Sequence, residues 1–344
     1  MEKPILVLKF GTASITLEDG SLDATAMRNI VDQVAVLNQQ YRIVMVSSGA
    51  VGTGKRYLKS YSGNLTERKA AAAIGNPLLV NLYTTMFQKH DIFIAQSLCE
   101  RQHFSNRSQF LQLRSTYETL WENNIIPIAN ENDVVSNLEL RFSDNDELAS
   151  LIAIGFGAEV LLLGTSVPGV LDEKGEVVPE IKSFDASVMG LARKDKSSSG
   201  LGGMISKLTF ARLATRMGIK VVIFDAKDEL GIVMALKGMR GTQCLPKESN
   251  ISARNKWLAS GSLVMGRLLL DAGAKEALLN RKSLLAVGVK KVEGNFAKGE
   301  VCELALEGEA PFAVARARFS SDQISLQDRT KNMEIAHADE IVLL

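Results

Sequence analysis

The sequence predicts an α/β protein, a three-layer α/β/α sandwich with a mainly parallel sheet, followed by a small C-terminal domain rich in β-structure. Short apolar runs rich in β-branched residues recur along the first two thirds of the chain. These runs are continuous rather than alternating, which is typical of strands buried on both faces of a parallel sheet. Longer segments with helical periodicity separate them, and this alternation places helices on both faces of the sheet.

Six apolar runs are expected to be strands of the large sheet. They are Ile5–Phe10, Ile43–Ser47, Ile92–Ser97, Ile125–Ala129, Val160–Gly164 and Val221–Phe224. Five helices are expected between them, over residues 23–40, 66–90, 107–123, 144–157 and 203–218.

The pattern changes near residue 240. Residues 241–256 are polar, turn-prone and contain Pro246, so we expect a linker between one domain over 1–240 and another over 257–344. Glycine turns separate the short strands that we expect in the second domain. These strands are Ser283–Val292, Glu300–Leu306, Phe312–Phe319 and Glu340–Leu344.

Length and composition limit the possible functions. The chain has 344 residues, of which 46% are hydrophobic and 23% charged, as is ordinary for a globular protein of two domains. The 40 basic and 39 acidic side chains leave a net charge of +1, which excludes an electrostatic grip of the whole protein on nucleic acid or membrane. Three scattered cysteines without CxxC spacing argue against a disulfide framework or zinc site and favour a reducing cytoplasm.

Neither a signal peptide nor a membrane span is expected. The apolar N-terminal run is too short for a signal peptide. The longest apolar stretch, Leu148–Leu171, is divided by Glu159 into runs too short to cross a bilayer. We therefore expect a cytoplasmic protein.

Glycine-rich segments follow the first two predicted strands, at the sheet edge where open parallel sheets bind ligands. Residues 9–14, KFGTAS, offer a lysine and a glycine that suit a phosphate. Residues 47–55, SSGAVGTGK, match the GxxxxGK spacing of a phosphate loop. Arg56 stands where that motif needs Ser or Thr for magnesium, so we prefer a turn at which Ser48 and backbone N–H groups hold an anion such as a carboxylate.

Two clusters of acidic and amide residues and one further lysine complete the candidate site. The clusters are NEND at 130–133 and DND at 144–146, and they are suited to bind an ammonium group or to orient lysines around a phosphate. Capping of the helix by Ser143 or Asp144 explains the second cluster as well. Lys207 lies in the first turns of a helix after the glycine-rich segment 197–203, which suits an anion, although it could also be an exposed helical lysine.

Together these motifs resemble the glutamate 5-kinases, a branch of the amino acid kinase family. The likeness rests on KFGTAS, VSSGAVGTG, IIPIANENDVV, FSDNDELASLIA, LLLGTSVPGVL and SGLGGMISK, which occur in this order. The later segment LDAGAKEALLNRKSLLAVGVKKVEGNFAKGEVCEL resembles the appended PUA domain of that family, so the small domain is expected to be barrel-like.

The resemblance implies phosphorylation of the L-glutamate side-chain carboxylate by ATP and Mg²⁺, giving L-glutamyl 5-phosphate for proline biosynthesis. Lys9 and Lys207 would act on the phosphates as catalytic residues, and Asp146 would orient them. Residues expected to bind substrate are Ser48, Gly49, Asn132, Asp133, Asp144 and Asn145. Residues expected to bind nucleotide are Lys9, Gly11, Thr12, Thr165, Ser166, Gly202, Gly203, Met204 and Lys207. No protein metal ligand is expected, because Mg²⁺ would be held mainly by phosphates and water.

Two departures from the family pattern lie on the nucleotide side. Ser166 stands where the family usually has Asp, and the loop before Lys207 is shorter than usual. The resemblance also implies a homo-oligomer inhibited by proline. One alternative is another kinase of the family, acting on acetylglutamate, aspartate or uridylate. The other is a degenerate kinase whose PUA domain binds RNA. The shortened loop and the basic residues Lys290, Lys291, Arg316 and Arg318 suggest it.

Overall fold

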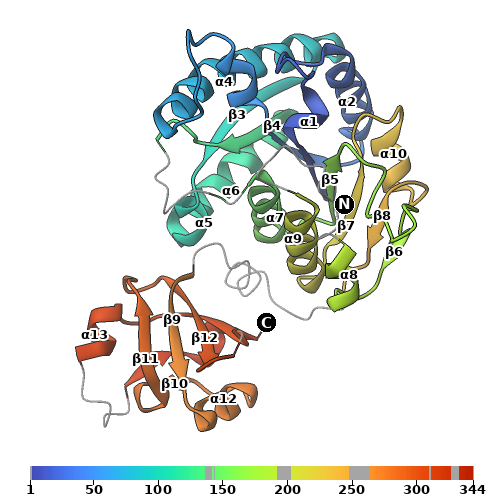
Figure 1. Cartoon of the computed structure of the whole chain (residues 1–344). Helices are drawn as coiled ribbons and strands as arrows, with labels where there is room; N and C mark the ends of the chain where they lie inside the picture. The colour runs from blue at the N-terminus through green and yellow to red at the C-terminus, as the bar shows by residue number, and fades with distance from the viewer. Residues whose placement is uncertain are drawn as a thin grey trace. The chain divides into compact units, whose positions relative to one another are not determined.

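Figure 1 shows the computed structural model of the chain, which describes residues 2–135, 142, 144–191, 203–247, 264–309, 311–326 and 333–343. The chain divides into two compact units. One contains Met1–Glu100 and Leu111–Ser249, and the other contains Arg101–Phe110 and Asn250–Leu344. The domain boundaries expected from the sequence stay a prediction, and residues 248–256 of the expected linker lie outside the described residues.

An eight-stranded sheet in the order β3-β4-β2-β1-β5-β7-β8-β6 forms the centre of the first unit. All its pairings are parallel except that of β7 with β8. The six predicted strands are confirmed as β1–β5 and β7. The strands are β1 (Ile5–Phe10), β2 (Arg42–Ser47), β3 (Phe93–Cys99), β4 (Ile125–Glu131), β5 (Val160–Thr165), β6 (Glu180–Ile181), β7 (Lys220–Asp225) and β8 (Thr242–Cys244).

Helices cover both faces of this sheet (Figure 1), which confirms the predicted three layers. Helices α2, α4 and α10 share one hydrophobic core with β1, whereas α7 packs on the opposite face against β1 and β5. The helices of the first unit are α1 (Thr12–Ile15), α2 (Ala24–Leu37), α3 (Ala50–Lys55), α4 (Leu65–Phe87), most of α6 (Arg107–Glu122), α7 (Asn145–Phe156), α8 (Ala186–Leu191), α9 (Met204–Arg216) and α10 (Gly231–Leu236). No helix within the described ranges has both the length and the apolar character of a membrane span.

The sheet order places a ligand-binding edge beside β1. From β1 the chain proceeds to its neighbour β2, whereas from β5, on the other side of β1, it proceeds towards β7. Connections that diverge from adjacent strands open a crevice at their carboxyl ends, where α/β proteins bind ligands. The register sets Phe10 opposite both Ser47 and Gly164, so the three strands end at the same level.

The second unit is a small domain with its own hydrophobic core. It contains a five-stranded sheet in the order β11-β9-β12-β13-β15 and the pair β10-β14. Its strands are β9 (Val264–Leu270), β10 (Leu284–Leu285), β11 (Val289–Gly294), β12 (Val301–Leu306), β13 (Ala313–Arg316), β14 (Glu334–Ala336) and β15 (Ile341–Leu343). Its helices are α12 (Ala272–Leu279), α13 (Ser321–Leu326) and, from the earlier segment of the chain, α5 (Gln102–Ser105).

Several described elements differ from the sequence expectations, among them β9 (Val264–Leu270), which the sequence did not predict. Thr242–Cys244, inside the expected linker, forms β8, a fully buried strand that pairs with β7. The expected strand Ser283–Val292 is divided into β10 and β11 by a 3₁₀ turn at Ala286–Gly288. A Cβ atom at Gly288 would lie 2.6 Å from the Cβ of Ala274, so α12 packs closely on this turn.

Candidate active site

Three charged side chains meet beside the carboxyl end of β1. Asp146 Oδ1 lies 2.6 Å from Lys9 Nζ, and Asp146 Oδ2 lies 2.9 Å from Lys207 Nζ. All three are buried, with side-chain exposures of 0% for Asp146, 5% for Lys9 and 6% for Lys207. The structure therefore brings together the three residues that the sequence nominated as catalytic, in one buried ionic bridge.

Each member of the bridge comes from a different element. Lys9 points from β1 towards the face that α7 covers, because side chains alternate along a strand and Leu8 and Phe10 lie in the opposite core. Asp146 lies in the first turn of α7, and Lys207 lies in the first turn of α9. Because α7 packs against both β1 and α9, its first turn lies between the two lysines.

Burial and charge act in opposite directions on the bridge. Burial alone would raise the pKa of Asp146, but Lys9 and Lys207 outweigh it and hold that pKa below its ordinary value. Burial lowers the pKa of Lys9, and attraction to Asp146 only partly opposes this. Asp146 is therefore an anion whose charge is stabilised by two cations.

Asp144 caps α7 at the edge of the bridge. Its Oδ1 accepts hydrogen bonds from the backbone N–H groups of Asp146 and Glu147, at 2.9 and 3.1 Å, as the capping interpretation predicted. Burial raises the pKa of Asp144, and repulsion from Asp146 raises it further. Two carboxyl groups two residues apart thus have pKa values displaced in opposite directions.

A second polar group lies at the ends of β2 and β4. Asn145 Nδ2 donates to Ser48 Oγ and to Asn130 Oδ1, both at 2.9 Å. Asn130 Nδ2 donates in turn to Asn76 Oδ1 on α4, at 3.0 Å. The sequence nominated Ser48 and Asn145, and it drew attention to Asn130 only within NEND. Asn76 was missed, and its one signal is an amide in an alanine-rich helical segment.

The turn after β2 requires glycine. Gly49 has φ +102°, and a Cβ atom there would lie 2.9 Å from Ile15 Cδ1. A phosphate loop would direct Lys55 to the ligand, but Lys55 lies at the other end of α3, and its Cε is 3.0 Å from the position of a Cβ on Gly20. The geometry favours the turn over the phosphate-loop alternative.

The remaining predicted substrate residues follow β4. Asn132 donates through Nδ2 to Glu100 Oε1 at 3.0 Å, and its backbone N–H bonds to Cys99 at 2.8 Å. It is therefore tied to the end of β3. Asp133 is half-buried in the turn that follows.

The predicted nucleotide residues lie at three strand or helix ends. Gly11 precedes α1, which begins at Thr12, and a Cβ at Gly11 would lie 3.5 Å from Lys9 Nζ. Thr165 ends β5, and the exposed Ser166 follows it. Gly203 and the buried Met204 begin α9, whereas Gly202 lies outside the described residues. Their roles stay predictions.

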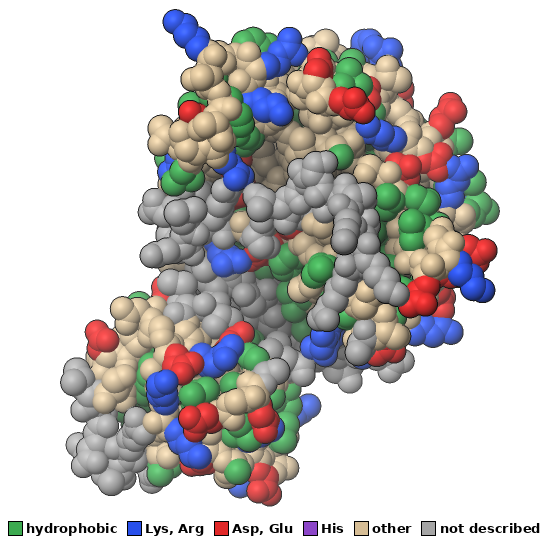
Figure 2. Space-filling view, viewed as in Figure 1, with side chains coloured by type: hydrophobic (Ala, Val, Ile, Leu, Met, Phe, Trp, Pro, Cys, Tyr) green, Lys and Arg blue, Asp and Glu red, His purple; other side chains and the backbone are tan. Residues whose placement is uncertain are grey.

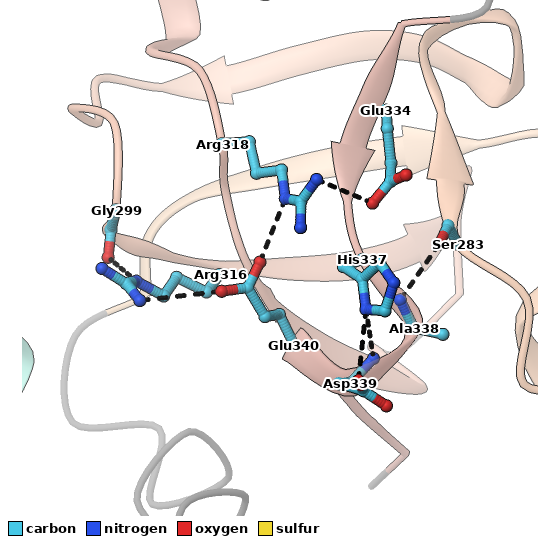
Figure 3. A network of polar contacts seen from close by, with 9 residues as sticks. All are labelled: Ser283, Gly299, Arg316, Arg318, Glu334, His337, Ala338, Asp339 and Glu340. Atoms are coloured by element: carbon cyan, nitrogen blue, oxygen red, sulfur yellow. Dashed lines mark hydrogen bonds and ion pairs between the residues drawn. The ribbon is translucent and has the colours of Figure 1, made fainter.

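Three of the four basic residues that suggested an RNA-binding surface, Lys291, Arg316 and Arg318, are paired with acids, and Figure 3 shows the two arginines. Arg318 lies 2.9 Å from Glu334 and 3.3 Å from Glu340, and Arg316 lies 3.6 Å from Glu340. Lys291 pairs with Glu293 at 2.9 Å. Basic and acidic side chains are also interspersed on the visible face of each unit (Figure 2). This pairing weakens the argument for an RNA-binding patch built on these residues.

Comparison with known proteins identifies the family. Residues 4–225 match the amino acid kinase family, and residues 266–338 match the PUA domain. The chain belongs to the amino acid kinase family. The ionic bridge lies within the part of this amino acid kinase that the family match covers.

Curated relatives of this amino acid kinase match it over nearly its whole length. A glutamate 5-kinase of Trichlorobacter lovleyi is 33% identical, with 98% of this chain and 96% of the relative covered. One from Kosmotoga olearia is 36% identical, with 92% and 89% covered. One from Haemophilus influenzae is 32% identical over the whole of both chains.

A solved carbamate kinase of Giardia shares the fold of this amino acid kinase. It has a TM-score of 0.51 and 18% identity, covering 71% of this chain and 99% of that one.

Proposed function

We propose that this amino acid kinase transfers the terminal phosphoryl group of ATP to the side-chain carboxylate of L-glutamate, forming L-glutamyl 5-phosphate for proline biosynthesis. The observation that carries the proposal is the buried bridge of Lys9, Asp146 and Lys207 beside the Ser48–Asn145 contact. The full-length likeness to curated glutamate 5-kinases supports the choice of substrate.

The proposed reaction needs positioning and charge stabilisation rather than a general base. A glutamate carboxylate is already ionised at neutral pH, because its ordinary pKa is about 4.3. Phosphoryl transfer then requires alignment of the two substrates and cancellation of negative charge on the transferring oxygens. Lys9 and Lys207 would supply that cancellation, and Asp146 would keep both ammonium groups directed into the site.

Magnesium would enter this site with the nucleotide. Within the described ranges, no group of three or more His, Cys, Asp or Glu side chains is arranged to hold a metal ion. The ammonium groups of Lys9 and Lys207 suit phosphate oxygens, and those oxygens together with water would carry the metal. Bound in that way, Mg²⁺ would neutralise part of the phosphate charge.

We assign the other predicted residues by their place at the sheet edge. Ser48, Gly49, Asp144 and Asn145 would hold glutamate, with Asn132 and Asp133 contributing from the end of β4. The ends of β1, β5 and α9 would hold ATP through Gly11, Thr12, Thr165, Ser166, Gly203 and Met204, with Gly202 beside them. A homo-oligomer and inhibition by proline stay predictions from the resemblance, and RNA binding by the PUA domain stays an alternative prediction.

A hydroxamate assay with ATP, Mg²⁺ and single candidate acceptors tests the function. We expect acyl phosphate to form with L-glutamate, and none without ATP. Lys207→Ala should lower kcat by about 100-fold or more, which ties the activity to this site. ADP release with acetylglutamate, aspartate or UMP, and none with glutamate, would overturn the proposal.

A further inference from the structure

Two side chains of helix α4 form hydrogen bonds with the strand ends at the proposed glutamate-binding part of the site. The Asn76 side-chain oxygen accepts from Asn130 at the end of β4, at 3.0 Å. Two helical turns further along, the Tyr83 hydroxyl lies 3.0 Å from Ser47 Oγ at the end of β2. Asn76 and Asn130 are only 4% and 5% exposed, so their hydrogen bonds are made away from solvent.

A backbone group fixes which way the Asn130 amide points. The N–H of Glu131 donates to Asn130 Oδ1 at 2.9 Å, and a backbone N–H can only donate. Asn130 must therefore keep its oxygen towards Glu131, and its NH₂ group faces Asn76. The same reasoning requires Asn76 to present its oxygen to Asn130.

The orientation of the Asn130 amide in turn fixes the orientation of the Asn145 amide. Asn130 Oδ1 faces Asn145, so Asn145 must present its NH₂ group, which donates to both Asn130 and Ser48. Asn145 Oδ1 then points away from these partners, and it is buried without a hydrogen-bond partner among the described residues. Because Ser48 Oγ accepts from Asn145, the hydroxyl hydrogen of Ser48 is left to donate.

Asn145 Oδ1 thus offers one acceptor, and the hydroxyl of Ser48, its hydrogen-bond partner, offers one donor. An α-amino acid carries a donor and an acceptor in the same arrangement, as its ammonium and carboxylate groups. A buried acceptor that meets no donor costs binding energy, so a substrate lacking the ammonium group should bind poorly.

We propose that Asn76 is a positioning residue that holds Asn130 and Asn145 in this polarity and thereby sets the preference of the site for substrates with an α-ammonium group. The identity of the substrate rests on the proposed function. Asn76 acts only through Asn130, so it belongs to neither the catalytic nor the substrate-contacting residues.

Asn76→Ala tests the proposal, with 2-hydroxyglutarate as the analogue that lacks the ammonium group. We expect KM for glutamate to rise about tenfold and the preference for glutamate over 2-hydroxyglutarate in kcat/KM to fall about tenfold. KM for MgATP should change less than about twofold, because the hydrogen bond of Asn76 is made with Asn130, on the proposed glutamate side of the site. Loss of stability alone would not change the preference between the two acceptors.

Two further variants separate positioning from packing. Asn76→Asp keeps an oxygen for Asn130, and the Asn76 NH₂ group that it replaces has no partner among the described residues. This variant should therefore retain most of the preference for glutamate. Asn81→Ala, the alanine change at an exposed position of α4, should leave both kinetic constants unchanged. An unaltered preference in Asn76→Ala, or an equal loss in Asn76→Asp, would overturn the proposal.

A neutron crystal structure of the ligand-free protein separates this inference from the proposed function. Deuterons on Asn145 Nδ2 that point at Ser48 and Asn130 would support the inference even if glutamate were not the substrate. A reversed Asn145 amide would overturn it even in an active glutamate kinase.

Discussion

At the scale of single residues, Asp146 and Asp144 show how environment decides the charge of one kind of side chain. Burial raises the pKa of Asp144, whereas the two lysines beside Asp146 outweigh the same effect. The ion pairs of Asp146 therefore stabilise the folded state, whereas keeping Asp144 ionised in the folded state costs free energy. A carboxyl group whose pKa is raised by its surroundings is typical of a functional site.

Asp144→Asn should gain stability relative to the wild type as pH rises. A carboxyl group with a raised pKa favours the folded state below its unfolded pKa, near the ordinary 3.8, and this contribution is lost as pH rises through the folded value. Asparagine has no proton to lose, so it stays neutral at every pH, and it keeps the capping oxygen. Denaturant unfolding from pH 3 upwards should show the variant gaining on the wild type above about pH 3.8. The opposite trend would contradict the raised pKa.

At the scale of elements, the packing of α3 on α4 sets the position of the turn at Ser48 and Gly49. A Cβ atom at Gly75 would lie 1.8 Å from the backbone oxygen of Ala50, and one at Gly54 would lie 1.8 Å from that of Ala71. The two helices are therefore in backbone contact, and neither position has room for a methyl group.

Gly75→Ala should destabilise the protein although alanine is the better helix former. Glycine to alanine inside a helix normally adds up to about 1 kcal/mol of stability. Here we expect the free energy of unfolding to fall by about 2–4 kcal/mol, because the helices must separate. Gly190→Ala in α8 is the matched control, since nothing lies within 4 Å of its added methyl group, and it should be neutral or slightly stabilising. Equal effects at both positions would contradict the close contact.

The sequence located most elements of the large sheet, because buried parallel strands are continuous apolar runs. In the small domain the sequence analysis missed β9, because Gly266 and Arg267 interrupt its apolar run. Tertiary contacts explain both residues. A Cβ at Gly266 would lie 2.5 Å from Phe296, and Arg267 pairs with Glu303 at 2.7 Å. No local pattern contains these distant partners.

The same limit applies to the site. Lys9, Asp146 and Lys207 stood in recognisable motifs, and the structure brought them together. Asn76 stood in none, since its partner Asn130 is 54 residues away. Sequence reasoning therefore found the charged groups placed for chemistry and missed Asn76, which orients the amides of Asn130 and Asn145.

At the scale of the whole molecule, each unit has a hydrophobic core of its own among the described residues. One lies between the large sheet and helices α2, α4 and α10, and the other includes Leu268, Leu304 and Ile335 of the small domain. A core of its own allows a domain to unfold as its own cooperative unit.

Calorimetry should accordingly resolve two unfolding transitions. Leu304→Ala removes a fully buried side chain of the small domain and should lower only one transition, by about 2–5 kcal/mol of unfolding free energy. MgATP with glutamate should raise only the other, because ligands stabilise the unit that binds them. A single transition that responds to both changes would contradict independent unfolding.

The order of the three bridging residues along the chain also affects how the protein emerges during synthesis. Lys9 is made first, and its strand β1 gains its second neighbour only when β5, Val160–Thr165, has been made. Asp146 precedes β5, so the counterion is already present when the sheet closes around the lysine. The growing chain therefore never needs to bury that ammonium group alone, which would be a costly intermediate.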